Sequence, residues 1–167
     1  MKRGFTLIEM VVYVAIMAIV VTTLVIFTSD SIKANNKSRM LRVTLDNARR
    51  SLEVMTKEIK HSESFYTPTS LFDSSPGQLS LNSTKNPPTA EEETYVDFYI
   101  EDERLYIKRE GTDSEALTSN EVRVTNLEFR NLGSSIQIDL TIDYKSSSLR
   151  PAYQASTSLT TSTTLRK

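Results

Sequence analysis

The chain has 167 residues, a formal net charge of −1 at pH 7 and no cysteine. The lack of cysteine excludes a disulfide framework and a thiolate metal site. The hydrophobic fraction of 38% and the mean hydropathy of −0.31 are those of a soluble protein, so any long apolar segment must be confined to one part of the chain.

That apolar segment lies at the N-terminus, where residues 10–27 contain no charge. The 23 residues of 5–27 would form a helix about 34 Å long, close to the ~30 Å hydrocarbon core of a bilayer. The run is too long for an ordinary secretory signal and lacks the small-residue cleavage site that ends one. The sequence therefore predicts a retained helix, residues 5–28, that crosses the membrane once.

Glu9 is the one carboxylate inside this segment. A charge at the bilayer centre costs about 2.5–3.5 kcal/mol on insertion scales, so an intramembrane carboxylate marks a functional site by default. The alternative is that Glu9 lies at the headgroups, six residues after Arg3, and is solvated there. The charge alone does not separate these two interpretations.

The residues around this carboxylate separate them. Residues 1–12 read MKRG followed by FTLIEMVV, and this pattern resembles the class III signal of type IV prepilins and type II secretion pseudopilins. The resemblance implies that a prepilin peptidase recognises the leader through Lys2 and Arg3 and cleaves after Gly4. It also implies methylation of the new amino group on Phe5 and retention of the apolar helix in the mature protein.

The resemblance gives Glu9 a role in assembly. Cleavage would create a cationic amine on Phe5, four residues before Glu9, and methylation would leave that charge in place. In the family the carboxylate is taken to meet this amine on a neighbouring subunit, since opposite charges attract far more strongly in low dielectric than in water. Within one chain, Glu9 would also lie in the first helical turn, where the helix dipole favours an anion. We expect Glu9 to direct the subunit into a filament.

The helix is expected to continue well beyond the membrane, because residues 5–67 contain no glycine or proline. Residues 29–62 carry an apolar stripe at alternating spacings of four and three, which is typical of a helix packed on a partner surface. We interpret this stripe as the side that packs on the chain's own sheet, since a coiled coil needs three to four heptads. Residues 29–38 have weak helix propensity, which leaves open a break there. The stripe consists of Leu41, Leu45, Ala48, Leu52, Met55 and Ile59.

Beyond residue 62 the pattern predicts strands. Residues 67–94 are rich in polar and loop-forming residues and predict a loop insertion that contains one short strand at 79–81. Residues 95–100 and 105–108 predict a hairpin with a polar four-residue connection at 101–104.

Two further strands are predicted nearer the C-terminus. Apolar residues between Val122 and Phe129 suggest one, and the strict alternation of residues 136–144 gives the clearest, after a turn at 133–135. The last segment, 152–167, fits either an edge strand or a frayed tail.

Together these elements predict an α+β fold. A long N-terminal helix, membrane-spanning in its first half, packs by its second half on a small antiparallel β-sheet head, and the resemblance implies the same pilin-like arrangement. The expected boundaries are residues 1–4 for the leader, 5–28 for the transmembrane or filament-core helix, 29–62 for its amphipathic extension, and 63–167 for the head with its insertion at about 67–94.

No catalytic, metal or cofactor site is predicted. His61 is the only histidine, and we interpret it as a cation at the helix end. The acidic runs at residues 91–93 and 101–103 lack EF-hand spacing and read as solvated loops. No phosphate-binding or nucleophile motif occurs, so we expect no enzyme and no cofactor. Basic residues near the membrane lack interleaved aromatics, so nucleic acid is not an expected partner.

The direction of insertion depends on the resemblance. Residues 30–60 hold eight Lys or Arg against four acids, and a literal positive-inside count would place this side in the cytoplasm. The prepilin-like cleavage site implies the opposite, with the leader cytoplasmic and the head extracytoplasmic. We therefore expect a single-pass protein of the cytoplasmic membrane that enters a surface or periplasmic filament.

The function implied is a structural minor pilin or J-type minor pseudopilin of a type IV pilus or type II secretion-like filament. Its expected partners are other pilin or pseudopilin subunits, the prepilin peptidase and the inner-membrane assembly platform. The sequence leaves open which machine is served, including a DNA-uptake apparatus. The alternative is a membrane-anchored extracytoplasmic binding or adhesion module whose N-terminus serves for export alone. A tethered hydrolase ranks last, with one histidine and no cysteine.

Overall fold

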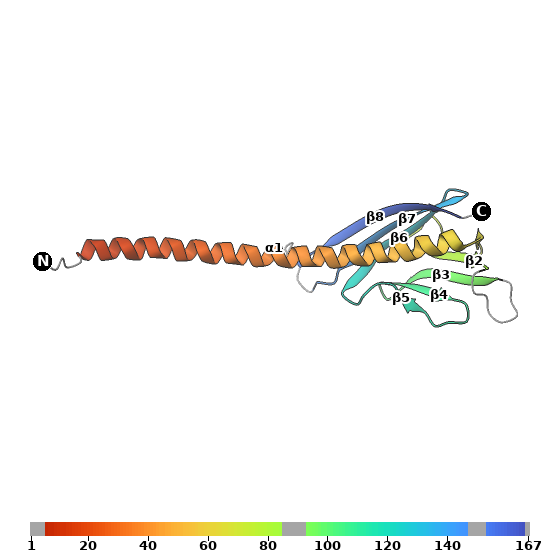
Figure 1. The fold of residues 1–167 in the computed structure, drawn as a ribbon, viewed down its shortest axis with the longest axis horizontal. Coiled ribbons are helices and arrows are strands. Elements are labelled where there is room, and N and C mark those ends of the chain that lie inside the picture. The colour runs from red at the N-terminus through yellow and green to blue at the C-terminus, as the bar shows by residue number, and fades with distance from the viewer. Residues whose placement is uncertain (1–5, 85–92, 147–152, 166–167) are drawn as a thin grey trace.

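The computed structural model describes residues 6–84, 93–146 and 153–165. These residues form one long helix and two antiparallel sheets, which confirms the predicted α+β class. The first half of the helix projects away from the head, and the strands lie alongside its second half (Figure 1).

The helix α1 spans Leu7–His61 without interruption. It begins at the N-cap residue Thr6 and ends at Ser62, whose hydroxyl donates to the Glu58 carbonyl at 2.7 Å. The break left open at residues 29–38 is absent, since weak propensity costs only a few tenths of a kcal/mol per residue when neither glycine nor proline intervenes.

A five-stranded sheet in the order β1-β2-β3-β4-β5 forms one side of the head. The predicted strand at 79–81 and the predicted hairpin are both present, as β2 and as β3 with β4. The predicted length of the hairpin connection is wrong. The connection has two residues and not four: Asp102 and Glu103, with φ of 48° and 61°. Two positive φ values give the twist that matches antiparallel strands. The strands are β1 Ser64–Phe65, β2 Leu79–Ser83, β3 Thr94–Glu101, β4 Arg104–Arg109 and β5 Glu115–Ala116.

A second, three-stranded sheet in the order β6-β7-β8 forms the other side, where one sheet was expected. β6 spans Val122–Asn131, β7 spans Ser135–Tyr144 and β8 spans Ser156–Thr164. The register between β6 and β7 shifts between Val124 and Asn126, which is a β-bulge. β8 is an edge strand, so of the two alternatives for the C-terminal segment the strand is the correct one for residues 156–164.

The first part of the predicted insertion is attached to β6. The Asp73 amide donates to the Phe129 carbonyl at 2.9 Å, and the Gly77 amide donates to the Leu127 carbonyl at 2.8 Å. A Cβ on Gly77 would lie 3.0 Å from both the Leu127 oxygen and a Phe129 ring carbon, so glycine permits this close approach. The loop therefore covers the edge of β6 and connects the two sheets.

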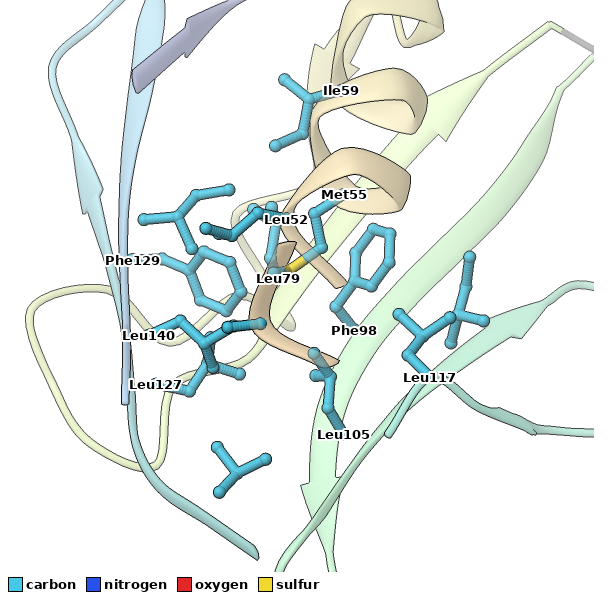
Figure 2. Close-up of a cluster of buried hydrophobic side chains, with 14 of the residues drawn as sticks. Leu52, Met55, Ile59, Leu79, Phe98, Leu105, Leu117, Leu127, Phe129 and Leu140 are labelled. Atoms are coloured by element: carbon cyan, nitrogen blue, oxygen red, sulfur yellow. The ribbon is translucent and has the colours of Figure 1, made fainter. Parts of the chain in front are cut away.

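The core lies where α1 meets both sheets. Figure 2 shows Leu52 and Met55 of α1 directed between Phe129 of β6 on one side and Phe98 of β3 on the other. The largest of these side chains are completely buried. The core cluster includes Ala48, Leu52, Met55, Ile59, Leu79, Leu81, Phe98, Leu105, Ile107, Leu127, Phe129, Ile138, Leu140 and Ile142.

The predicted helix stripe is correct at its C-terminal end and wrong at its N-terminal end. Leu41 is 39% exposed, and Thr44 is buried instead. Thr44 Oγ1 lies 2.7 Å from Thr157 Oγ1 of β8, so its hydroxyl is hydrogen-bonded where the edge strand crosses the helix. A pattern of apolar residues cannot reveal a buried position that a paired hydroxyl occupies.

Candidate functional site

The first half of α1 presents an apolar surface that the head does not cover. The large apolar side chains of residues 7–27 are between 47% and 83% exposed. By length and composition, α1 is long and apolar enough to cross a membrane. An apolar surface of this size needs lipid or other protein around it.

Three threonine hydroxyl groups of this half are satisfied within the helix itself. Thr22, Thr23 and Thr28 each donate to the carbonyl four residues earlier, at 2.8–2.9 Å. In a water-free environment every polar group must find an internal partner, and these side chains do so. These three hydroxyl groups therefore need no hydrogen-bond partner outside the helix, which keeps the outward surface of this half apolar.

Glu9 interrupts this surface in the first turn of α1, as predicted. Its backbone amide donates to Oγ1 of the N-cap Thr6 at 3.3 Å, and its Oε1 accepts from the Tyr13 hydroxyl at 3.3 Å. Both contacts are long for hydrogen bonds of their kind. Glu9 is the only charged residue in 6–29, and it forms no ion pair with any residue that the structure describes.

The remaining predicted site residues, Lys2, Arg3, Gly4 and Phe5, lie outside the described residues. The contact of Glu9 with Tyr13 was not predicted. The signal for it was present, since residues four apart lie one above the other on a helix face.

The acidic and histidine groups of the head offer no cofactor site within the described ranges. His61 is the last residue of α1, and its Nδ1 lies 2.6 Å from the Lys57 carbonyl. Residues 101–103 lie at the β3–β4 turn, and Glu91 and Glu92 of the other acidic run lie outside the description. No group of three or more metal-ligating side chains occurs in residues 6–84, 93–146 and 153–165.

A groove of about 510 Å³ runs between α1 and β8. Arg49, Lys57 and Lys60 line its helix side, and Leu159 lines its strand side. The groove is mainly basic, and its lining offers charge and apolar contact rather than a paired nucleophile and base.

Comparison with known families identifies the N-terminal segment. Residues 1–25 match the model of the prokaryotic N-terminal methylation motif, the prepilin-type signal of type IV pilins and pseudopilins. Pilin-type proteins are structural, and the motif implies interaction with other pilins and with a prepilin peptidase in general. No curated protein and no solved structure matches the chain. The exposed apolar helix fits a membrane-anchored protein of this kind.

Proposed function

We propose that this chain is a structural subunit of a type IV pilus or a type II secretion-like filament, of the minor pilin or minor pseudopilin kind. The prepilin-type signal at residues 1–25 and the uncovered apolar half of α1 support this function. The observation that carries it is Glu9, a carboxylate in a membrane-length helix with no cation partner among the described residues.

Processing would prepare the subunit for assembly. Lys2 and Arg3 mark the leader for the prepilin peptidase, which cleaves after Gly4 and methylates the amino group of Phe5. The methylated amine keeps its positive charge. Residues 5–28 anchor the chain once in the cytoplasmic membrane, with the head on the extracytoplasmic side.

Assembly would then pair Glu9 with the Phe5 amine of a neighbouring subunit. Placing an unpaired carboxylate in a medium of low dielectric costs free energy. The attraction of a nearby cation offsets that cost, and this attraction is stronger in low dielectric than in water. Before assembly, the Tyr13 hydroxyl donates a hydrogen bond to Glu9, which lowers the free-energy cost of the unpaired carboxylate. The apolar helices pack together in the filament core, and the assembly platform in the inner membrane adds subunits one at a time.

Three features support a minor subunit. The chain has no cysteine pair, it carries the polar insertion at about residues 67–94, and its C-terminal half is rich in strands. This function requires no catalysis, and we propose that the chain is not an enzyme. The alternative, an anchored binding or adhesion module, would use the same export signal without entering a filament.

The test is to isolate sheared filaments or pseudopilus complexes from cells that express the full chain and to determine the mass of its N-terminal peptide. A peptide that begins at methylated Phe5 in the filament fraction supports the proposal. A processed chain that stays in the membrane as an isolated monomer contradicts it and favours the binding module.

A further inference from the structure

Among the described residues, the edge formed by β8 is the one sheet edge that is both long and uncovered. β1 and β5, which end the five-stranded sheet, have two residues each. The β6 edge of the other sheet is covered by the loop that bonds to the Leu127 and Phe129 carbonyls. β8 has nine residues and pairs only with β7. Short or covered edges are a usual protection against pairing with another chain, and β8 has neither form of it.

The sequence of β8 also lacks the other features that protect an edge. Its nine residues read STSLTTSTT and contain no charge, proline or glycine. Its register with β7 is regular from Ser156 to Thr164, without a bulge. Charged residues, proline and bulges are the features that normally prevent pairing at an edge. β8 is therefore a regular template for one further strand.

The backbone groups of alternate β8 residues point to this free edge. The Tyr144 amide donates to the Ala155 carbonyl at 2.8 Å, and the Leu165 amide donates to the Ser134 carbonyl at 3.3 Å. Hydrogen-bonded pairs alternate along an antiparallel ladder, so the odd-numbered residues of β8 bond to β7. The even-numbered residues direct their amides and carbonyls away from β7, where no described residue bonds to them. These residues are Ser156, Ser158, Thr160, Ser162 and Thr164.

The groove between α1 and β8 lies beside this edge, on the side of the strand that faces the helix. Thr157 meets Thr44 of α1 on that side, and Leu159 lines the groove of about 510 Å³. Both are odd-numbered, so that set of side chains faces α1, and the even-numbered set is exposed to solvent. Strands in a sheet lie about 4.8 Å apart, so a strand added to β8 would lie over the groove. Every second side chain of the added strand would point into it.

The helix side of the groove is basic. Arg49, Lys57 and Lys60 are exposed there, and Glu53 is the one acid among the described lining residues. None of these three bases forms an ion pair with a residue that the structure describes. Side chains that enter the groove would therefore meet unpaired cations, and acidic side chains are the ones that complement them.

We propose that β8 and this groove together form an acceptor for one further strand, an extended segment with acidic side chains at alternate positions. The segment belongs to a different subunit of the filament, and this part of the inference rests on the function proposed above. Main-chain hydrogen bonds along β8 supply the affinity. The alternate acidic side chains over the groove supply the specificity.

A second copy of this chain does not fit the acceptor. β8 itself has no acidic residue to offer the groove. β8 runs lengthwise along α1 (Figure 1), so antiparallel pairing of two β8 strands would point their helices in opposite directions. Two chains anchored in one membrane by the same helix cannot take that arrangement. A partner of another kind also agrees with a minor subunit, which need not contact its own copies.

Binding of synthetic strands to the full-length processed chain in detergent micelles tests the acceptor. The probe is a fluorescent peptide that alternates threonine and glutamate and matches the nine residues of β8 in length. One control peptide has lysine in place of glutamate, and another carries N-methyl groups on its backbone amides. Each control should bind at least about tenfold more weakly, because one loses the charge match and the other loses its hydrogen-bond donors. Equal binding by all three peptides, or no binding of the threonine–glutamate peptide, would overturn the proposal.

Hydrogen exchange, followed by NMR, locates the bound peptide. The amides of Ser158, Thr160 and Ser162 should gain protection when the threonine–glutamate peptide binds. The amides of Thr157 and Leu159 should change little, because the ladder with β7 already engages them. Protection confined to the five-stranded sheet would place the peptide elsewhere and overturn the acceptor.

Changes in the chain separate the two contributions. Ser162→Pro removes one outward amide and leaves the ladder with β7 intact, since proline is tolerated where an edge amide faces solvent. It should weaken binding about tenfold, whereas the matched control Ser162→Ala should bind as the unchanged chain does. Equal binding by these two variants would contradict strand addition. Lys57→Glu with Lys60→Glu should reverse the preference between the glutamate and lysine peptides, a reversal that mere damage to the head would not give.

Photo-cross-linking tests the partner in filaments. p-Benzoylphenylalanine in place of Ser162, in cells that assemble filaments, should join this edge to an acidic segment of a different filament subunit, identified by mass spectrometry of the joined peptides. A cross-link only to a second copy, or no cross-link in filaments that contain the chain, would overturn this proposal and leave the function standing. Absence of the processed chain from the filament fraction would contradict the function and with it the filament partner, so the two failures are distinguishable.

Discussion

Glu58 of α1 and Arg109 of β4 are joined at 2.7 Å between Oε1 and Nη2. The carboxylate side chain is 18% exposed and the guanidinium side chain 42% exposed. This ion pair links the helix to the five-stranded sheet across 51 residues of sequence. It holds the last turns of α1 in place between the two halves of the head.

Replacing either partner should lower the stability of the head by a small amount. We expect Glu58→Ala and Arg109→Ala to show a coupling energy of about 0.5–1 kcal/mol in a double-mutant cycle, since partial exposure screens the pair. The measurement is urea unfolding of the full chain in detergent. Strictly additive single changes would show that the pair contributes nothing.

The hydroxyl contact between α1 and β8 gives a second prediction. Thr44→Val keeps the shape of a completely buried side chain but removes the 2.7 Å contact to Thr157 Oγ1. We expect a loss of about 1–2 kcal/mol in the free energy of unfolding, because a part-buried hydroxyl loses its partner. Thr164→Val, at an exposed position of the same strand, is the control and should change stability little. Equal effects of the two changes would contradict this account.

The corrected helix stripe is tested by two truncations on α1. Met55 is completely buried between the sheets, whereas Leu41 is 39% exposed. Met55→Ala should cost about 2–5 kcal/mol. Leu41→Ala should cost less than about 0.5 kcal/mol, as at most surface positions. A large loss of stability for Leu41→Ala, measured by the same urea unfolding, would favour the stripe predicted from the sequence, in which Leu41 faces the core.

Sequence reasoning succeeded where one physical signal dominates. The long apolar run, the lack of glycine and proline and the alternation of residues 136–144 predicted the helix and β7 directly. It also predicted the strand β6 from its apolar residues, but it did not predict the bulge in that strand. The β6 residues Val122 and Val124 share a face with Leu127 and Phe129 only because the bulge near Thr125 changes the alternation.

Tertiary contacts explain the other differences. Glu103 adopts a positive φ that the sequence did not suggest, and its carbonyl accepts from the Val124 amide at 2.8 Å, so the tight turn is held by the other sheet. The division into two sheets depends on contacts between distant segments that no local pattern encodes. At the candidate site, the position of Glu9 in the first turn was predicted from the sequence. Its contact with Tyr13 was not predicted, although the spacing of four residues places the two side chains on one helix face.

Tyr13→Phe tests the local partner of Glu9. The change removes one long hydrogen bond of 3.3 Å and leaves the ring in place. We expect cleavage and membrane insertion to be unchanged and the amount of chain in filaments to fall about two- to tenfold, as for the loss of one ordinary hydrogen bond. Tyr144→Phe in the head is the matched control. No change in incorporation would show that Tyr13 does not assist the carboxylate.

The central claim is that filament assembly requires the negative charge of Glu9. Incorporation of the Glu9→Gln chain into filaments tests this claim most directly. Glutamine keeps the length of the side chain and an oxygen that can accept from Tyr13, but it offers no charge to an incoming amine. Glu9→Leu removes both properties. The account predicts that each variant is cleaved after Gly4, methylated and inserted normally, as mass spectrometry of the membrane fraction would show, yet is missing from filaments. Incorporation of Glu9→Gln at the level of the unchanged chain would contradict it.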